Sequence, residues 1–521
     1  MDKVKQEKVL TTFFKSFKAS FEVVDKMGYI EQFMLPMLQS CDLQVLTSFF
    51  AANLPDIWAI IKEKFEAKQS FTALRGQMVA KSGCFKIVEV MYGRLSHADF
   101  QKDMPIGNAF PEQDSLNKLM TKAAYSVRSE KLAVRIDEQK LYQEYQCSAF
   151  NTLVAIICCL YPQIQDTEEL KYSEFLFASQ KSNWAQIVDC SSVFGLRIDF
   201  EKIPTKKSIL VNIRTDARTH RRAMGAARLG SYRSQTVQYI ASQQLFDSSL
   251  SEDVTKFDLS NVSVMSFSPD SQGSAAADSQ PDEVQQEILL EMDSFNQHPC
   301  MPILCALVRK LGAKPKPPGK TLPKWMQNLL ETMRNASTHS NVKMFLTKLI
   351  INTEDVFKQY AEHWLEVLCA VVNSKSLGKT INYMITDTVS VILGWHDKAV
   401  PDMGHNMQKI EASTLLLTMM EMSCHRRRDV MKFALELIKT MVEVWKAALS
   451  VNYQFLYQVV CESKDSNSIE VGLQLTAILL VNKRVPWNAA SQVDFLNSLI
   501  EKHLMSTDKK IRGVAAENLG K

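Results

Sequence analysis

NTEDVFKQYAEHWLEVLCAV, residues 352–371, carries a clear helix signal. Its first two residues are polar capping residues, and the two acids that follow suit the positive end of a helix. Apolar side chains then recur at spacings of 3, 4, 4 and 3 residues, at Phe357, Tyr360, Trp364, Leu368 and Val371. This spacing forms one apolar stripe, so the stretch predicts an amphipathic helix that buries one face.

The same spacing recurs through most of the chain, because only 17 glycines and 16 prolines interrupt its 521 residues. Helices of this kind succeed one another at intervals that suit helix pairs of about 40 residues, the period of stacked two-helix repeats. We therefore expect an all-α fold, a HEAT-like helical-repeat solenoid. Further helices are predicted at 340–351, 380–395, 407–422, 427–447, 466–482 and 490–505.

The C-terminal residues 508–520, DKKIRGVAAENLG, resemble the second helix of a HEAT repeat. In such a helix small residues allow close helix contact, and an Asp and an Arg tie neighbouring repeats. The chain stops at Lys521 without the polar capping repeat that the end of a solenoid requires. We therefore expect this chain to be a piece of a longer polypeptide.

A basic strip runs directly into an acidic, serine-rich segment. Residues 206–233 hold eight Lys and Arg against one acid, and residues 234–296 hold eleven Asp and Glu against one Lys. Such charge blocks are costly to bury, so we expect them to stay solvated as contact or modification surfaces. The chain then divides into a helical-repeat region (1–205), a basic strip with a disordered, phosphorylatable Ser/Gln-rich insertion (206–282), and a second helical-repeat region (283–521), incomplete at the C-terminus.

Four Ser-Gln dipeptides lie in this part of the chain, where the composition of residues 234–280 predicts about 1.5 by chance. They begin at Ser234, Ser242, Ser271 and Ser279. The excess indicates phosphorylation by a kinase that selects Gln after Ser, although composition alone stays an alternative. Each phosphate would add about 1.5 to 2 negative charges. A segment that carries several phosphates could therefore fold onto the basic strip or displace a polyanion from it.

The arginines of the basic strip are candidates for binding a polyanion. The alternatives are a solvated helix face or a nuclear-import signal, because the strip has no interleaved aromatic residues and no recognised DNA-reading motif. The candidates are Arg214, Arg218, Arg221, Arg222, Arg228 and Arg233.

The remaining sequence offers little catalytic or metal chemistry. Its eleven cysteines are scattered, mostly among apolar neighbours, as in the reduced core of a cytosolic or nuclear protein. Neither His298, Cys300 and Cys305 nor Cys424 and His425 supplies a four-ligand zinc pattern. Kinase, Walker and nucleophile-elbow motifs are absent from the sequence, so we expect no catalytic residue, metal or cofactor in this chain.

Membrane insertion and secretion are not expected either. The longest apolar run, residues 153–161, has about half of the roughly 20 residues that a membrane span needs. The first eight residues are charged and lead into an amphipathic pattern, unlike a signal peptide.

Several longer segments carry a family resemblance. In them the chain is similar, over nearly its whole length, to the middle helical-repeat region of the DNA-dependent members of the phosphatidylinositol 3-kinase-related kinases. The segments are long enough to be specific, unlike a short motif. They are residues 146–151 with 157–159, residues 290–293, residues 345–354, and residues 438–443 with 445–446.

The resemblance also reaches the insertion, through residues 250–252 and 257–260. In the family this region carries an autophosphorylation cluster that affects the processing of DNA ends. Ser271 is the closest positional match to a Ser-Gln site there, and the other three serines are supported by their dipeptide context alone. The family's kinase domain lies far toward the C-terminus of the full polypeptide, and none of its motifs occurs in this sequence.

The resemblance implies a scaffold segment of a nuclear, DNA-dependent, non-specific Ser/Thr protein kinase. Such a segment would act in double-strand break repair by non-homologous end joining, alongside the Ku heterodimer, DNA ends and other end-joining proteins. One alternative is an independent helical-repeat adaptor, for example a transport-receptor-like protein. Another is a thiol or metal enzyme, which would require a bound metal or a reactive low-pKa thiol.

Overall fold

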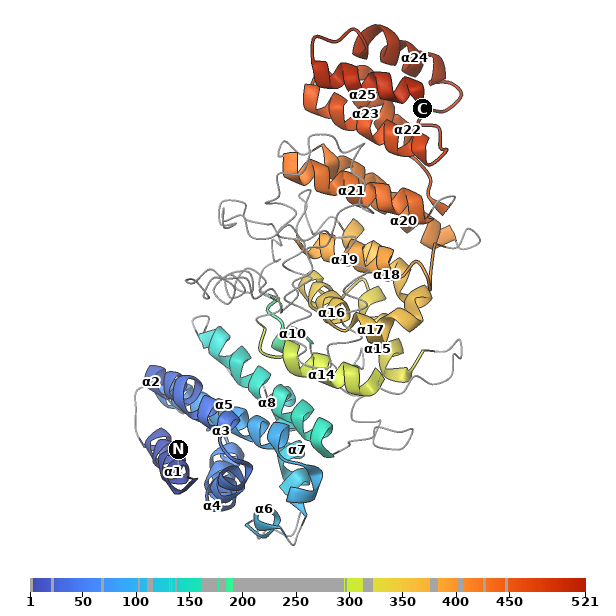
Figure 1. The fold of residues 1–521 in the computed structure, drawn as a ribbon. Helices are drawn as coiled ribbons and strands as arrows, with labels where there is room; N and C mark the ends of the chain where they lie inside the picture. Colours follow the sequence, from blue (N-terminus) through green and yellow to red (C-terminus); the bar gives the residue numbers. More distant parts are fainter. Residues whose placement is uncertain are drawn as a thin grey trace, which may run out of the picture. The chain divides into compact units, whose positions relative to one another are not determined.

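A computed structural model provides the structure, and every regular element in its described residues is a helix (Figure 1). The all-α helical-repeat prediction is therefore confirmed. The described residues form two compact units, residues 1–192 with 298–345 (unit 1) and residues 193–297 with 346–521 (unit 2). The structure describes residues 3–19, 23–66, 70–101, 104–109, 116–130, 132, 134–135, 138–160, 177, 184–190, 295, 298–312, 322–374, 383–401, 406–424, 428–445 and 448–521.

Unit 1 is assembled from helices on both sides of the predicted insertion. Its two longest helices, α5 and α8, lie side by side and form its centre (Figure 1). The elements are α1 (Lys3–Lys18), α2 (Val23–Tyr29), η1 (Ile30–Met34), α3 (Leu35–Ser40), α4 (Leu43–Lys62), α5 (Phe71–Arg94), η2 (His97–Phe100), α6 (Pro105–Asn108), α7 (Leu116–Ser126), η3 (Val127–Ser129), α8 (Gln139–Leu160), α10 (Trp184–Ile187), α14 (Met301–Gly312), α15 (Lys324–Arg334) and the start of α16 (Ser340–Asn352).

A glycine permits the close packing of α5 against the N-terminal helices. A Cβ atom on Gly83 would lie 2.8 Å from Phe17 Cζ and 3.2 Å from Ile30 Cδ1. Both of those side chains are buried, so they have no free space to move into. The absence of a side chain at this position therefore lets α1 and η1 approach α5.

The apolar helix α4 belongs to the core of unit 1. By length and composition it could cross a bilayer, and within the described part of the chain no other helix meets that test. Nine of its residues are buried, among them Phe49, whose ring meets Phe14 edge to face at 5.9 Å between centroids. Such burial is typical of a core helix, and α4 packs on α1, α5 and α6.

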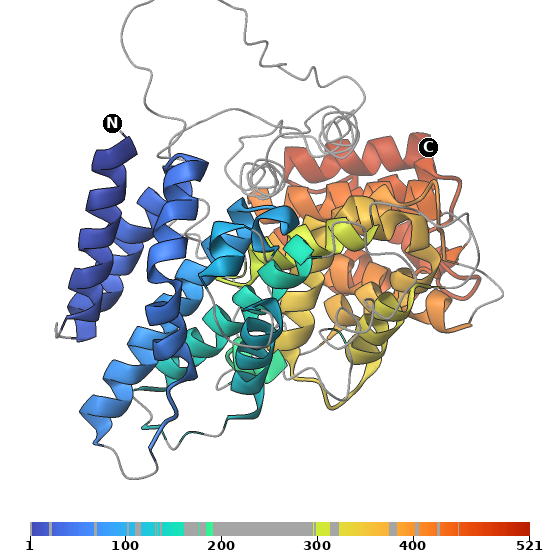
Figure 2. The same cartoon turned by 90° about the horizontal axis from the view of Figure 1, so that it is seen from below.

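Unit 2 is a succession of helix pairs, seen from yellow to red in Figures 1 and 2. The first helices of successive pairs begin at residues 361, 406, 453 and 492, close to the period of about 40 residues typical of two-helix repeats. After the end of α16 the elements are α17 (Glu354–Phe357), η6 (Lys358–Tyr360), α18 (Ala361–Asn373), α19 (Tyr383–Gly394), α20 (Asn406–Ser423), α21 (Arg428–Trp445), α22 (Tyr453–Tyr457), η9 (Gln458–Glu462), α23 (Ser466–Val481), α24 (Gln492–Asn497), η10 (Ser498–His503) and α25 (Lys509–Gly520).

The predicted helix ranges agree with these elements, with two corrections. The prediction for 490–505 corresponds to a short α-helix, α24, that continues as the π-helix η10. The helix predicted after Thr353 is divided into α17, the 3-10 turn η6 and α18. Thr353 does not cap it, because its hydroxyl donates backward to the Leu349 carbonyl at 2.6 Å. The apolar stripe still buries Phe357, Trp364 and Leu368.

The polar residues of the last helix, α25, make different hydrogen bonds from those expected of a HEAT repeat. Asp508 caps α25 by accepting a hydrogen bond from the Lys510 amide at 2.8 Å. Arg512 donates to the main-chain oxygens of residues 506 and 507, so both side chains act within their own repeat. The contact between helices is instead made by Asn518, which donates to the Leu473 carbonyl of α23 at 2.8 Å.

Candidate functional site: the root of the insertion

The sequence-predicted site residues all lie outside the described residues and so remain predictions. They are Ser234, Ser242, Ser271 and Ser279, together with Arg214, Arg218, Arg221, Arg222, Arg228 and Arg233. The nearest described residues are 184–190 on one side and 295 and 298–300 on the other. These flanking segments meet on α8, and we call their contacts with each other and with α8 the insertion root.

The main-chain oxygen of Ile187, at the end of α10, is the centre of the insertion root. It accepts a hydrogen bond from Gln143 Nε2 of α8 at 2.8 Å, and His298 Nε2 lies 2.8 Å from it. The other ring nitrogen of His298 accepts from the Cys300 amide at 3.1 Å. This second bond fixes the tautomer, because a ring nitrogen that accepts leaves Nε2 to carry the proton and donate.

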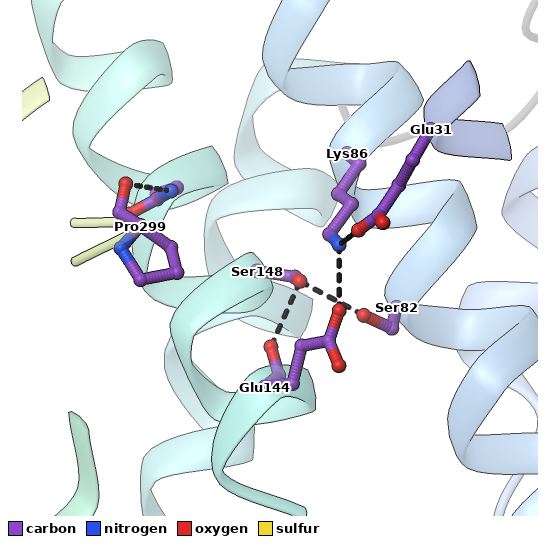
Figure 3. Close-up of polar contacts among 7 residues, drawn as sticks. Glu31, Ser82, Lys86, Glu144, Ser148 and Pro299 are labelled. Atoms are coloured by element: carbon purple, nitrogen blue, oxygen red, sulfur yellow. Dashed lines mark hydrogen bonds and ion pairs between the residues drawn. The ribbon is translucent and has the colours of Figure 1, made fainter. Parts of the chain in front are cut away.

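Further hydrogen bonds join each flank to the rest of unit 1. Asn151 of α8 donates to the Pro299 carbonyl at 3.0 Å, drawn at one side of Figure 3. Asn341, at the start of α16, donates to the Asp189 carbonyl at 2.7 Å. Because these are side-chain bonds to main-chain oxygens, they fix the path of the backbone on both sides of the insertion.

Aromatic rings form the apolar part of the insertion root. Trp184 of α10 lies with its ring centroid 6.2 Å from that of Phe177 and 6.4 Å from that of Phe345. The Phe177 ring lies 5.4 Å from Trp325, and the His298 ring meets Phe345 at 4.7 Å. All four apolar rings are buried, and aromatic pairs at such separations contribute about 0.5 to 1.5 kcal/mol each beyond their burial.

Two cysteine thiols lie within the insertion root. Cys147 of α8 directs its Sγ to the Ile187 carbonyl at 3.7 Å, and Cys300 directs its Sγ to the Cys147 carbonyl at 3.9 Å. A hydrogen bond from the Cys300 thiol lowers the pKa of Cys147 to about 6, and His298 acts in the same direction. Burial raises the pKa of the Cys300 thiol well above its usual value.

Polar contacts between α5 and α8, which we call the polar seam, hold the helix that carries the insertion root. Lys86 of α5 forms ion pairs with Glu31 of η1 and, at 2.7 Å, with Glu144 of α8 (Figure 3). Burial opposes its charge, but the two carboxylates together raise the pKa of Lys86. One turn along each helix, the hydroxyls of Ser82 and Ser148 lie 2.8 Å apart. The seam fixes the register of α8, the helix on which the flanks of the insertion meet.

Glu89 lies on α5 close to Asn151, the residue that holds Pro299. Burial raises the pKa of its carboxyl to about 7, while Asn151 and Lys86 oppose that rise. Asn151 Oδ1 is buried and has no hydrogen-bond partner among the described residues. A protonated Glu89 carboxyl can donate a hydrogen bond to an acceptor such as Asn151 Oδ1, whereas an ionised carboxylate cannot. These surroundings therefore favour the protonated form of Glu89.

The insertion root is an anchoring site by its chemistry, since its bonds end on main-chain oxygens. Within the described ranges no group of three metal-ligating side chains comes together. Sequence reasoning noticed the proximity of His298 and Cys300 but missed Cys147, which is 153 residues from Cys300. No local pattern signals a contact across that separation, and only the neighbouring apolar residues indicated that Cys147 is buried.

Comparisons with known proteins agree along the whole chain. The family model of the DNA-dependent protein kinase catalytic subunit, CC3, matches residues 26–401, and the DNA-PKcs CC5 model matches residues 413–521. The chain is 30% identical over 553 residues to the DNA-dependent protein kinase catalytic subunit of Canis lupus familiaris and 31% identical over 548 residues to that of Mus musculus. Each alignment covers 99% of this chain, which spans 13% of the length of either relative.

Proposed function

Because the chain belongs to the family of the DNA-dependent protein kinase catalytic subunits, we propose that it is a scaffold segment of a DNA-dependent Ser/Thr protein kinase. The kinase would act in double-strand break repair by non-homologous end joining. The observation that carries this proposal is the family match over residues 26–401, together with the helix-only architecture of the described residues. Stacked helices present long surfaces without a catalytic centre of their own, as a scaffold requires.

The proposal includes a regulatory role for residues 206–282, as an autophosphorylation loop with Ser234, Ser242, Ser271 and Ser279 as targets. The geometry of the insertion root supports this role, because both flanks of the loop are held on α8 while its Ser-Gln sites lie between them. Each phosphate would add about 1.5 to 2 negative charges close in sequence to the basic strip. Phosphorylation would thus change the charge of the loop without moving the points where it is anchored.

The proposed partners are the Ku heterodimer, DNA ends and other end-joining proteins, and the proposed location is the nucleus. The arginines of the basic strip would contact a polyanion such as DNA, with an affinity that falls as salt rises. Phosphates on the loop would compete for those arginines, so binding and phosphorylation would oppose each other.

The experiment is phosphosite mapping of the chain after incubation with an active DNA-dependent kinase, with and without DNA ends. We expect phosphate at Ser271 and at the neighbouring Ser-Gln sites only when DNA ends are present. The variant Ser271→Ala should lose its phosphate while the other three sites keep theirs. As a matched control, Ser248→Ala, a serine without a following Gln, should leave the pattern unchanged. Absence of phosphate from all four sites would contradict the regulatory role.

A further inference from the structure

Cys147 and Cys300 form a pair that no sequence pattern connects. Cys147 is on α8 before the insertion, and Cys300 directly precedes α14 after it. Cys300 Sγ lies 3.9 Å from the Cys147 carbonyl, so the two cysteines are in direct contact. We propose that this pair is an oxidation site at which hydrogen peroxide forms a disulfide. The bond would close residues 148–299, which include the whole insertion, into a covalent loop.

Within the pair, the chemistry favours Cys147 as the thiol that reacts first with peroxide. A thiolate is the form of cysteine that reacts with peroxide. Its hydrogen bond with Cys300 lowers the pKa of Cys147 to about 6, a direction that favours the thiolate. Burial raises the pKa of nine other thiols: those of Cys41, Cys84, Cys158, Cys159, Cys190, Cys300, Cys369, Cys424 and Cys461.

The reaction is balanced in two steps. The Cys147 thiolate attacks one oxygen of hydrogen peroxide, the O–O bond breaks, and hydroxide leaves behind a sulfenic acid. The Cys300 thiol then attacks the sulfenic sulfur, an S–S bond forms, the S–O bond breaks, and water leaves with the Cys300 proton. Counted from the Cys147 thiolate, the two cysteines together lose two electrons and one proton, and one peroxide molecule is reduced to hydroxide and water.

Burial sets the rate of this reaction. Cys300 has no exposed surface and Cys147 is 3% exposed, so peroxide reaches the pair only when the insertion root opens locally. Once formed, the bond would hold the root closed, because α8 and residue 300 could no longer separate. The disulfide would thus convert a reversible anchor of the insertion into a permanent one until a thiol reductant opens it.

The test treats the purified chain with hydrogen peroxide, then blocks free thiols with iodoacetamide under denaturing conditions without reductant. We expect the number of alkylated cysteines to fall from eleven to nine, and a thiol reductant to restore all eleven. Digestion with two proteases and mass spectrometry should identify one cross-link, joining residues 147 and 300. The proposal is overturned if both cysteines remain alkylatable while other thiols oxidise, or if Cys147 reaches sulfinic or sulfonic acid without a cross-link.

Matched variants separate this pair from other thiols. Cys147→Ser and Cys300→Ser should each abolish the cross-link, whereas Cys305→Ser, a buried cysteine on α14, should leave it intact. A cross-link that persists in Cys300→Ser would overturn the proposal. Circular dichroism reports whether each variant folds, and the peptide map of the unaltered chain decides the question even if a variant does not.

Discussion

His298 Nε2 lies 2.8 Å from the main-chain oxygen of Ile187, a residue 111 positions earlier in the chain. The polypeptide therefore leaves the helices of unit 1 and returns to them at one point. The chain after that point supplies α14 and α15 to the same unit. Unit 1 is thus complete only when segments from both sides of the insertion have packed together.

Cleavage inside the insertion should leave unit 1 assembled. A protease recognition sequence introduced between Gly273 and Ser274 would allow the chain to be cut there. We expect the two fragments to co-elute in size-exclusion chromatography under native conditions, because α14 packs on α8 and the insertion root joins the flanks non-covalently. Separation of the fragments without denaturant would show that the root does not hold them.

Gly83→Ala should destabilise unit 1 by about 1 to 3 kcal/mol, because the added methyl group meets the buried Phe17 and Ile30 side chains. The measurement is the free energy of unfolding from urea denaturation. Gly93→Ala is the control on the same helix, since nothing lies within 4 Å of its Cβ position. That change should be neutral or stabilising by up to about 1 kcal/mol. Equal effects at the two positions would contradict close packing at Gly83.

The ion pair between Lys348 and Asp387 is buried, with side chains 1% and 4% exposed and a distance of 3.5 Å between Nζ and Oδ2. Asp387→Ala should cost about 3 to 5 kcal/mol of unfolding free energy, because it removes one partner of a buried ion pair. The double variant Lys348→Met with Asp387→Leu should recover most of that loss.

The control for this pair is the more exposed ion pair of Lys358 with Asp397 in the same unit, at 2.8 Å. Asp397→Ala should cost no more than about 1 kcal/mol. Urea denaturation of the four proteins gives the comparison. If the double variant were as unstable as Asp387→Ala, the loss would reside in packing and not in the broken ion pair.

Glu89 should make the stability of unit 1 depend on pH. Its carboxyl has an ordinary pKa of 4.5, and burial raises the pKa in the folded chain to about 7. Between these values the unfolded chain loses the proton while the folded chain keeps it, so stability falls as pH rises from 4.5 to 7 and then levels off. Glu89→Gln should flatten this part of the profile of urea midpoint against pH. Glu7→Gln, an exposed position on α1, should leave the profile unchanged.

Local sequence patterns were sufficient to identify the helices predicted after residue 340. The range 427–447 agrees with α21 to within two residues at each end, because the period of apolar residues directly encodes the buried face of a helix. The break of the helix after Thr353 could not be predicted, because the apolar stripe continues across η6. The hydrogen-bond partners of Arg512 could not be predicted either, because they depend on how the chain turns before α25.

The amino-acid sequence by itself determined the all-α class, the period of the helix pairs and the position of the charged insertion, since each is a property of neighbouring residues. Only the tertiary structure decided that Ile187, Cys147, His298 and Cys300 meet. The sequence indicates that an apolar side chain needs burial and that a buried polar side chain needs a hydrogen-bond partner. It does not indicate which residue is that partner, because the partner depends on how α8, α10 and α14 pack. For this reason composition predicts a charged insertion, which stays a prediction, whereas the contacts of its root could not be predicted.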